Sequence, residues 1–340
     1  MEMLAGKKVP AVYFVLLNWK GCQDTLDCLE SMANLSYTNY CAVVVENASG
    51  DVSLSAMKSW GQGKGIPVSE YEYGPAGEGL RAISRQQAGT SGFRHLLLIA
   101  SLSNTGFCAG NNIGMSLARE SGAEFLFVLN NDTVLANDVL EPLVKTAQSR
   151  PDAALFSPLI LYADKKETIW WGGGDFNNWM TPSYRHKGDG VSSLVCSGPY
   201  ESQWASGCAT FMQASIFDKF GGFDESFFIW CEEWDLSMRI RSGGYRIMVV
   251  PSSCVYHKIG RSLGITSPLV FYYSFRNLLM FRGRYLPFYK MLAYLVAYLP
   301  SKLLKALFYT MKFRQAGYLL GYFDAVLAAL RKEGGGWARQ

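Results

Sequence analysis

The sequence predicts an α/β fold in which a central sheet is flanked by helices and followed by a C-terminal helical extension. The apolar run at 125–129 is too short for a typical helix and too continuous for a half-exposed strand, which indicates a strand buried on both faces. A strand, a helix and a second strand within residues 9–45 are typical of a βαβ unit. With 49% hydrophobic and 18% charged residues among 340, the chain can form one large domain, or one domain with an appendage.

The first half supplies four apolar or β-branched runs and one clear helical pattern. The predicted strands lie at 9–17, 41–45, 95–100 and 125–129. Residues 24–32 are a predicted helix because Leu26, Leu29 and Met32 fall on one side of it. The Gly-, Ser- and Glu-rich residues 61–92 are predicted to be a loop or a variable helix edge. The Gly-rich stretch 104–114 is predicted to be a loop that enters a helix at 115–121.

The second half continues the alternation of strands and helices and then becomes helical. Strands are predicted at 153–162, 205–212 and 245–250, and helices at 142–148, 215–220 and 231–241. Residues 163–203, in which tryptophans and glycines mix with polar residues, are predicted to be irregular or hairpin-like, as in a recognition loop. Beyond Pro268 the chain is predicted to be helical, aromatic and basic.

Polar side chains stand at the ends of three predicted strands: Asn18, then Glu46 and Asn47, then Asn130, Asn131 and Asp132. In open α/β sheets the ligand crevice lies beyond the carboxyl ends of the strands. A carboxylate fixed there, such as Asp132, is well placed to hold a hard divalent cation. The alternative is a polar turn in which Asp132 caps the next helix.

The Gly-rich stretch adds glycines, amides and hydroxyls between a strand and a helix, among them Asn104, Gly106, Gly110 and Asn111. Glycine permits close approach of the backbone, and a helix N-terminus favours an anion. With the polar groups at 46–47 this suits a nucleotide, with base and ribose over the first two strands and the diphosphate near Asp132. The stretch neither follows the first strand nor reads G-x-G-x-x-G, which argues against a dinucleotide site. A tight strand-to-helix turn is the alternative.

Three carboxylates, Glu232, Glu233 and Asp235, lie within four residues and repel one another, so at least one must be paired, metal-bound or protonated. Glu232 and Asp235 are expected to share one helix face, with Glu233 pointing elsewhere. Because aromatic residues flank the cluster, one carboxylate is a candidate general base, whereas the alternative is a solvated acidic helix start. His257 follows a strand with Arg261 nearby, which allows a metal or diphosphate role. A packed, hydrogen-bonded histidine is the alternative.

Charge is distributed unevenly along the chain. Residues 271–340 contain eleven Lys and Arg against two acidic residues, whereas the first 270 residues are net acidic. A basic, aromatic tail favours an anionic membrane surface over nucleic acid. No uninterrupted apolar run reaches the roughly 18–20 residues of a spanning helix, so the protein is expected to lie on a membrane. The eight scattered cysteines predict reduced, mostly buried thiols, and no cleavable signal is recognised.

The pattern as a whole resembles the inverting family 2 glycosyltransferases of the GT-A fold, and among them the rhamnosyltransferase-like enzymes of bacterial polysaccharide assembly. The resemblance covers roughly residues 9–285. It rests on VLLNWK (15–20), VENASGD (45–51), NTGFCAGNNIG (104–114), LNNDT (129–133), GGFDESFFIWCEEWDLSMR (221–239) and HKIGRS (257–262). It implies a Rossmann-like mixed sheet in a catalytic domain at 1–270, with a nucleotide-binding half at about 9–135 and an acceptor half at about 136–270. Residues 271–340 then form a basic amphipathic helical region.

The resemblance also implies roles for single residues. Glu46 stands where the family has an Asp that contacts the nucleotide base. Asn130-Asn131-Asp132 stands for the metal-binding D-x-D, with Asn130 replacing the first Asp. Glu233 stands for the catalytic base, and His257 for a metal or diphosphate ligand.

The implied reaction is an inverting sugar transfer without a covalent intermediate. The donor is a nucleoside-diphosphate sugar, with dTDP-rhamnose the best guess, and the acceptor is a glycan or a lipid-linked glycan. A Mg²⁺ or Mn²⁺ ion is the implied cofactor, and the enzyme would lie in the cytoplasm, peripheral on the inner face of the cell membrane. An oligomer contact through the tail is possible, and no nucleic-acid partner is expected. Two alternatives stay open: a catalytically silent, membrane-docked scaffold, and a sugar-nucleotide pyrophosphorylase.

Overall fold

A computed structural model describes residues 3–4, 7–74, 79–184, 198–258, 267–331 and 333–337. The strands up to residue 135 are β1 (Met3–Leu4), β2 (Lys7–Lys8), β3 (Val12–Asn18), β4 (Asn39–Glu46), β5 (Val68–Tyr73), β6 (Leu80–Ser84), β7 (Gly92–Ser101), β8 (Phe125–Asn130) and β9 (Thr133–Leu135). The later strands are β10 (Ala153–Tyr162), β11 (Ile169–Trp171), β12 (Gly174–Phe176), β13 (Pro182–Tyr184), β14 (Tyr200–Ser202), β15 (Ala209–Gln213) and β16 (Arg246–His257). The helices are α1 (Cys22–Met32), α2 (Ser53–Gly63), α3 (Gly106–Glu120), α4 (Leu140–Ser149), α5 (Ala214–Phe220), α6 (Glu232–Ser242), α7 (Pro268–Tyr285), α8 (Phe288–Phe313) and α9 (Gly317–Arg331), with a 3-10 turn, η2, at Glu225–Phe227.

The central sheet confirms the predicted mixed α/β fold. Its strand order is β14-β16-β10-β15-β8-β3-β4-β7-β5-β6, with β11 paired to β10 and β9 paired to β16. β3 runs parallel to both β4 and β8, whereas β15 runs antiparallel to β8. Asn18 pairs with Glu46, and Leu17 pairs with Asn130. The polar ends of the three strands therefore meet at one edge of the sheet, as the sequence predicts.

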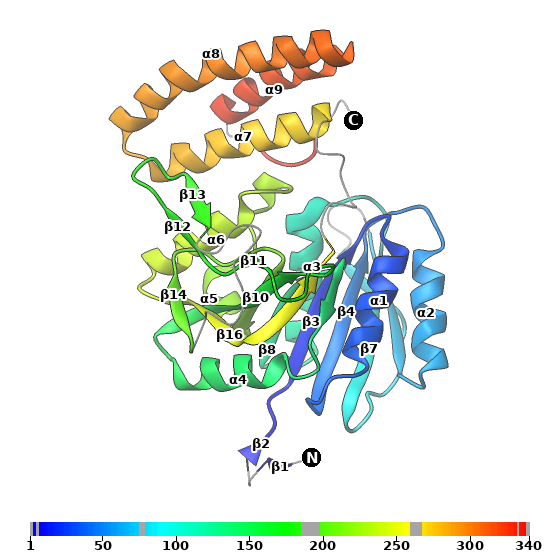
Figure 1. Cartoon of the computed structure of the whole chain (residues 1–340). Coiled ribbons are helices and arrows are strands. Elements are labelled where there is room, and N and C mark those ends of the chain that lie inside the picture. Colours follow the sequence, from blue (N-terminus) through cyan, green and yellow to red (C-terminus); the bar gives the residue numbers. More distant parts are fainter. Residues whose placement is uncertain are drawn as a thin grey trace.

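Helices cover both faces of the sheet, because side chains alternate along each buried strand. Val12, Phe14 and Leu16 of β3 pack with α1, α2 and α4. Tyr13 and Val15 pack on the opposite face with α3, α5 and α6. The result is three layers, with the helices α7, α8 and α9 added at one end (Figure 1).

Two local predictions are wrong. The stretch 104–114 is mostly helix, because α3 begins at Gly106. Its glycines allow close packing on the sheet, since a methyl group at Gly110 would lie 2.4 Å from the Leu17 side chain and one at Gly114 would lie 2.6 Å from Val15. Residues 61–92, predicted to be a loop, contain the end of α2 and the strands β5 and β6 at the sheet edge.

The expectation that no segment is long enough to span a membrane is also wrong. Within the part of the chain that the structure describes, α8 is long and apolar enough to cross one, and only 6% of that apolar window is buried. The longest apolar run in the sequence was taken to end at Pro300. The helix continues through this proline to Phe313. Length and composition alone fit both a spanning helix and one that lies along the surface.

Candidate active site

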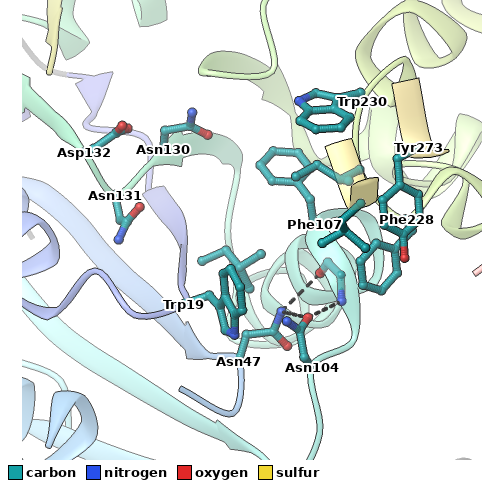
Figure 2. Close-up of a pocket in the computed structure, with 14 residues that line it drawn as sticks. Trp19, Asn47, Asn104, Phe107, Asn130, Asn131, Asp132, Phe228, Trp230 and Tyr273 are labelled. Carbon is teal, nitrogen blue, oxygen red and sulfur yellow. Dashed lines mark hydrogen bonds between the residues drawn. The ribbon is translucent and has the colours of Figure 1, made fainter. Parts of the chain in front are cut away.

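A cavity of about 190 Å³ opens at the sheet edge where β3, β4 and β8 end. Its lining residues are Leu17, Trp19, Asn47, Asn104, Gly106, Phe107, Asn130, Asn131, Asp132, Phe228, Ile229, Trp230, Leu269 and Tyr273. Figure 2 shows the polar strand-end residues on one side of this cavity and an aromatic wall of Phe107, Phe228, Trp230 and Tyr273 on the other. Six of the predicted site residues therefore line one cavity: Asn47, Asn104, Gly106, Asn130, Asn131 and Asp132.

Asn47 ties the end of β4 to the start of α3. Its amide nitrogen donates to Asn104 Oδ1 at 3.0 Å and to the Gly106 carbonyl at 3.3 Å (Figure 2). Its Oδ1 accepts from both the backbone N–H and the hydroxyl of Thr105. The N–H of Gly106 donates to Asn104, and the next two N–H groups of α3 donate to the Phe228 carbonyl. The expectation that this helix N-terminus offers free donors to an anion is therefore wrong, because protein oxygens already accept from them.

Two predicted residues lie behind the cavity. Asn18 is fully buried, accepts from the Thr25 hydroxyl at 2.8 Å and donates to Ser49 Oγ at 3.3 Å. The same Thr25 hydroxyl accepts from Asn131, which lines the cavity. Glu46 accepts from the N–H of Ser49 at 2.8 Å. Asn18 and Glu46 thus shape the turns beneath the cavity.

Gly110 and Asn111, which were also predicted to bind the donor, do not line the cavity. Gly110 lies against Leu17, and Asn111 is buried in α3, where its amide donates to the Phe107 carbonyl. Arg261 lies outside the described residues.

The predicted metal ligands Asp132 and His257 are brought together by different elements. Asp132 follows β8 and His257 ends β16, and His257 Nε2 lies 3.1 Å from Asp132 Oδ1. Burial opposes the charged imidazolium, but Cys208 and Asp132 beside the ring outweigh this effect and raise the pKa of His257 to about 10. His257 Nδ1 is buried without a hydrogen-bond partner.

These residues fit a divalent cation that also binds substrate oxygens. Within the described residues, no three His, Cys, Asp or Glu side chains cluster as metal ligands. Asp132 and His257 supply one carboxylate and one imidazole, and Asn130 adds an amide in the same cavity. Mg²⁺ is usually held by one or two carboxylates together with substrate phosphates, so a small protein donor set is sufficient for it.

Glu232 and Glu233 form a carboxyl pair at the start of α6. One oxygen of each side chain is completely enclosed without a partner, and the two carboxyl groups hydrogen-bond to each other. Burial raises the pKa of both, that of Glu232 well above its ordinary value and that of Glu233 to about 7. A proton held by Glu232 lowers the pKa of Glu233 relative to burial alone. The expectation that Glu233 points away from Glu232 is therefore wrong.

This pair does not line the cavity directly. A methyl group at Gly207 would lie 3.6 Å from Glu233 Cβ and 3.9 Å from the ring of Phe107, which is part of the cavity wall. The next residue, Cys208, accepts the N–H of Asn130 at 2.9 Å. Gly207 and Cys208 thus connect the glutamate pair to the strand end that carries Asp132.

Asp235 has different surroundings from the glutamates. It is buried, and its oxygens accept from Arg239 at 2.8 Å, Arg284 at 2.9 Å and Tyr285 at 2.9 Å. These contacts satisfy the carboxylate and connect α6 to α7. Glu232 and Asp235 are both buried in α6, three residues apart, which agrees with the expectation that they share one helix face, although Asp235 is bound by basic and phenolic groups.

The aromatic wall is a lining of the site that was not predicted from the sequence. Phe228, Trp230 and Cys231 adopt φ values of +63°, +67° and +71°. For residues with a Cβ this left-handed conformation costs roughly 1–2 kcal/mol each, so it persists only where surrounding contacts hold it. The run Phe227-Phe-Ile-Trp-Cys231 before two glutamates was the signal available in the sequence.

Comparisons with known proteins bear on the family of the chain. A sequence profile described as glycosyl transferase family group 2 matches residues 125–329. Rhamnosyltransferase WbbL of Escherichia coli (strain K12) is 25% identical over 168 residues, which cover 45% of this chain and 60% of that protein. An N-acetylglucosaminyl-diphospho-decaprenol L-rhamnosyltransferase of Mycobacterium tuberculosis is 28% identical over 157 residues, covering 42% of this chain and 49% of that protein. The chain thus spans about half to three fifths of these relatives' lengths.

Solved structures show the fold. GalNAc-T7 with UDP, GalNAc and Mn²⁺ superposes with a TM-score of 0.59 at 13% identity, covering 96% of this chain and 58% of that chain. The mannosyltransferase PcManGT of Pyrobaculum calidifontis, with GDP-Man and Mn²⁺, gives 0.53 at 13% identity, covering 96% and 88%. These likenesses show that the chain has the GT-A fold. The profile match spans more than half of the chain, and the protein belongs to glycosyl transferase family group 2.

Proposed function

We propose that the protein is an inverting glycosyltransferase that moves a sugar from a nucleoside-diphosphate donor to a hydroxyl of a glycan or lipid-linked acceptor. The observation that carries this proposal is the position of two buried acidic sites, one that lines the cavity and one that lies close to its wall. Asp132 lines the cavity beside His257, and Glu233 lies behind its wall at Phe107. One site suits a diphosphate-bound cation, and the other suits proton removal.

In this mechanism Glu233 accepts the proton of the acceptor hydroxyl as the oxygen attacks the sugar carbon. Glu232 keeps its own proton because burial and the charge of Glu233 raise its pKa well above the ordinary value, and it donates a hydrogen bond to the Glu233 carboxylate. A divalent cation held by Asp132, His257 and Asn130 would neutralise charge that develops on the diphosphate leaving group. Attack in line with the departing diphosphate inverts the anomeric carbon, so no residue forms a covalent intermediate.

The proposed donor is dTDP-rhamnose, and the names of the relatives support this choice. Beside the two rhamnosyltransferases above, a protein of Shigella flexneri named dTDP-rhamnosyl transferase is 23% identical over 193 residues, covering 54% of this chain and 62% of that protein. The aromatic wall gives a sugar ring or an acceptor apolar surfaces on which to pack.

The helices α8 and α9 support a membrane-bound acceptor at the cytoplasmic face of the cell membrane. Their exposed apolar side chains include Phe288, Val296, Leu304, Met311 and Leu330. Lysines and arginines on the same helices lie among these side chains, an arrangement typical of segments that lie in an anionic lipid interface. We propose that this face contacts the lipid headgroups.

A donor panel tests the proposed function. Thermal shifts of the full chain with dTDP, UDP and GDP, each with Mn²⁺ or Mg²⁺, identify the nucleotide that stabilises the protein. Transfer is then assayed with sugars of that nucleotide and a prenyl-diphosphate-linked N-acetylglucosamine acceptor. We expect dTDP with a divalent ion to give the largest shift and dTDP-rhamnose to be consumed. The absence of both a nucleotide shift and transfer across the whole panel would refute the proposal.

A further inference from the structure

The segment Phe227–Cys231, called here the 227–231 loop, joins η2 to α6 and forms the aromatic wall of the cavity. Three of its five residues have left-handed φ angles although none is glycine. Phe228, Ile229 and Trp230 line the cavity, and the loop ends immediately before Glu232. Its conformation therefore sets both the aromatic wall and the start of the helix that carries the proposed base.

The loop is held from outside by two neighbouring side chains of α7. The amide nitrogen of Asn277 donates to the carbonyls of Phe227 at 2.8 Å, Ile229 at 2.5 Å and Trp230 at 3.0 Å. The guanidinium of Arg276 donates to the carbonyls of Ser226 at 2.9 Å and Phe227 at 2.8 Å. Within the loop the Phe227 carbonyl also accepts the N–H of Ile229 at 2.7 Å, and the bonds from α7 add partners for the carbonyls of Ile229 and Trp230.

Arg276 and Asn277 are 1% and 0% exposed. The Arg276 guanidinium lies near the rings of Tyr272 and Tyr273 and also donates to the carbonyl of Gly335 at 2.8 Å. A buried guanidinium and amide are costly unless they are hydrogen-bonded, so both must be held in place for these contacts to form. The pair Arg276-Asn277 connects the loop, α7 and the C-terminal residues at one point.

Phe228 connects the loop to the start of α3 and to the ring of Tyr273. The Phe228 carbonyl accepts the N–H groups of Phe107 at 2.7 Å and Cys108 at 3.2 Å at the start of α3. The Phe228 ring stacks on Tyr273 of α7, with centroids 5.0 Å apart and an interplanar angle of 8°. Displacement of the loop would thus alter the aromatic wall of the cavity, to which Phe107 and Phe228 both belong.

We propose that Arg276 and Asn277 are positioning residues of the transfer reaction, which hold the 227–231 loop so that the aromatic wall and Glu233 are correctly placed for the acceptor. This inference rests on the proposed function and deepens it. Neither side chain touches substrate, since both act through the loop carbonyls. Nucleotide binding at the strand ends should depend little on them, whereas turnover should depend on them strongly.

The test is Asn277→Asp, which keeps the shape of the side chain and removes the donors, with Asn34→Asp as a matched control at an exposed amide. We expect Asn277→Asp to lower kcat more than tenfold, with nucleotide affinity within twofold of wild type. The acid limb of the kcat–pH profile should shift as well, because the surroundings of Glu233 change. Arg276→Lys, which keeps the charge and fewer of the bonds, should give a smaller loss of kcat.

A second readout does not need activity. Cys231 is 4% exposed at the end of the loop, so its alkylation by iodoacetamide, followed by mass spectrometry of its peptide, reports loop opening. Asn277→Asp should accelerate this alkylation at least fivefold, and Asn34→Asp should not. Unchanged kcat and pH profile in Asn277→Asp, whatever its alkylation rate, overturn the proposal.

Two further outcomes are also decisive. If Asn277→Asp does not fold, kcat and the pH profile of folded Arg276→Lys decide, and wild-type values of both overturn the proposal. If the wild-type protein transfers no sugar, the proposed function fails. In that case, an unchanged alkylation rate of Cys231 in Asn277→Asp separately refutes the claim that Asn277 holds the 227–231 loop.

Discussion

Replacing Gly106 by alanine tests how closely α3 and the 227–231 loop fit together. Gly106 has φ +82°, and a methyl group there would lie 2.5 Å from the Phe228 ring. The left-handed conformation costs a residue with a Cβ about 1–2 kcal/mol. Because the Phe228 ring is stacked on Tyr273, it has little room to retreat, and overpacking adds about 1–3 kcal/mol.

The two effects together predict that Gly106→Ala lowers the free energy of unfolding by about 2–5 kcal/mol. With an unfolding entropy of roughly 2.1 cal/mol/K per residue, the 340 residues give about 0.7 kcal/mol/K. The Tm should therefore fall by about 3–7 °C. We also expect kcat to fall, since the displaced Phe228 ring is part of the cavity wall.

Gly63→Ala is the matched control for thermal unfolding. Gly63 ends α2 with nothing within 4 Å of an added methyl group, so alanine there should leave the Tm unchanged or raise it slightly. Circular dichroism at a fixed scan rate gives both transitions. If Gly106→Ala unfolds within 1 °C of Gly63→Ala, the close fit between α3 and the loop is refuted.

Glu233→Gln should lower kcat by about 10²–10⁴-fold while nucleotide binding persists, and Glu232→Gln, which resembles the protonated acid, should retain most activity; inactivation of Glu232→Gln alone would reassign the base. The active form of Glu233 is the carboxylate, and burial raises its pKa to about 7, so kcat should rise with pH through neutrality and be lost at lower pH. The neighbouring titratable groups are Glu232, Cys108 and Cys231. A flat kcat between pH 5 and 8 would contradict this assignment. Asp132→Asn should lower kcat/KM by at least about 10²-fold in assays with a saturating divalent ion, and full wild-type activity in the presence of chelator would contradict the metal role. On α8, each of the substitutions Leu304→Ser and Met311→Ser should reduce co-sedimentation with phosphatidylglycerol vesicles about tenfold. The control Ile83→Ser on β6 should not reduce it. Equal vesicle binding of all three variants would contradict a lipid-facing α8.

The framework of the fold could be predicted because its strands are buried on both faces. Continuous apolar runs marked β3, β4 and β8, and their polar ends converged as expected because the register pairs Asn18 with Glu46 and Leu17 with Asn130. The start of α3 could not be predicted in the same way. Glycine and asparagine have low helix propensity, and only the contacts of Gly110 with Leu17 and of Gly114 with Val15 explain why they lie in a helix.

The positions of candidate site residues could be predicted where these residues follow a strand. They could not be predicted where contacts between residues far apart in the sequence determine the surroundings of a side chain. Asp132 and His257 were expected as partners and lie 3.1 Å apart. Within the acidic cluster, helical spacing predicted that Glu232 and Asp235 share one face of the helix. The spacing did not predict that Arg284, which lies 49 residues from Asp235 in α7, donates to the Asp235 carboxylate. No local pattern around α6 contains this information.

The C-terminal helices illustrate the same limit and have a consequence for the domain division. A boundary at residue 270 stays a prediction, but α7 contributes Tyr273 to the cavity and Asn277 to the loop that carries its wall. Two adjacent polar residues, Arg276 and Asn277, within the apolar run FYYSFRNLLMF were the available signal, because a buried polar pair in such a helix requires partners. If α8 and α9 contact lipid, α7 is the element that connects the membrane surface to the aromatic wall. A tail with only a docking role would not need these contacts, which is why we propose that α7 is part of the site.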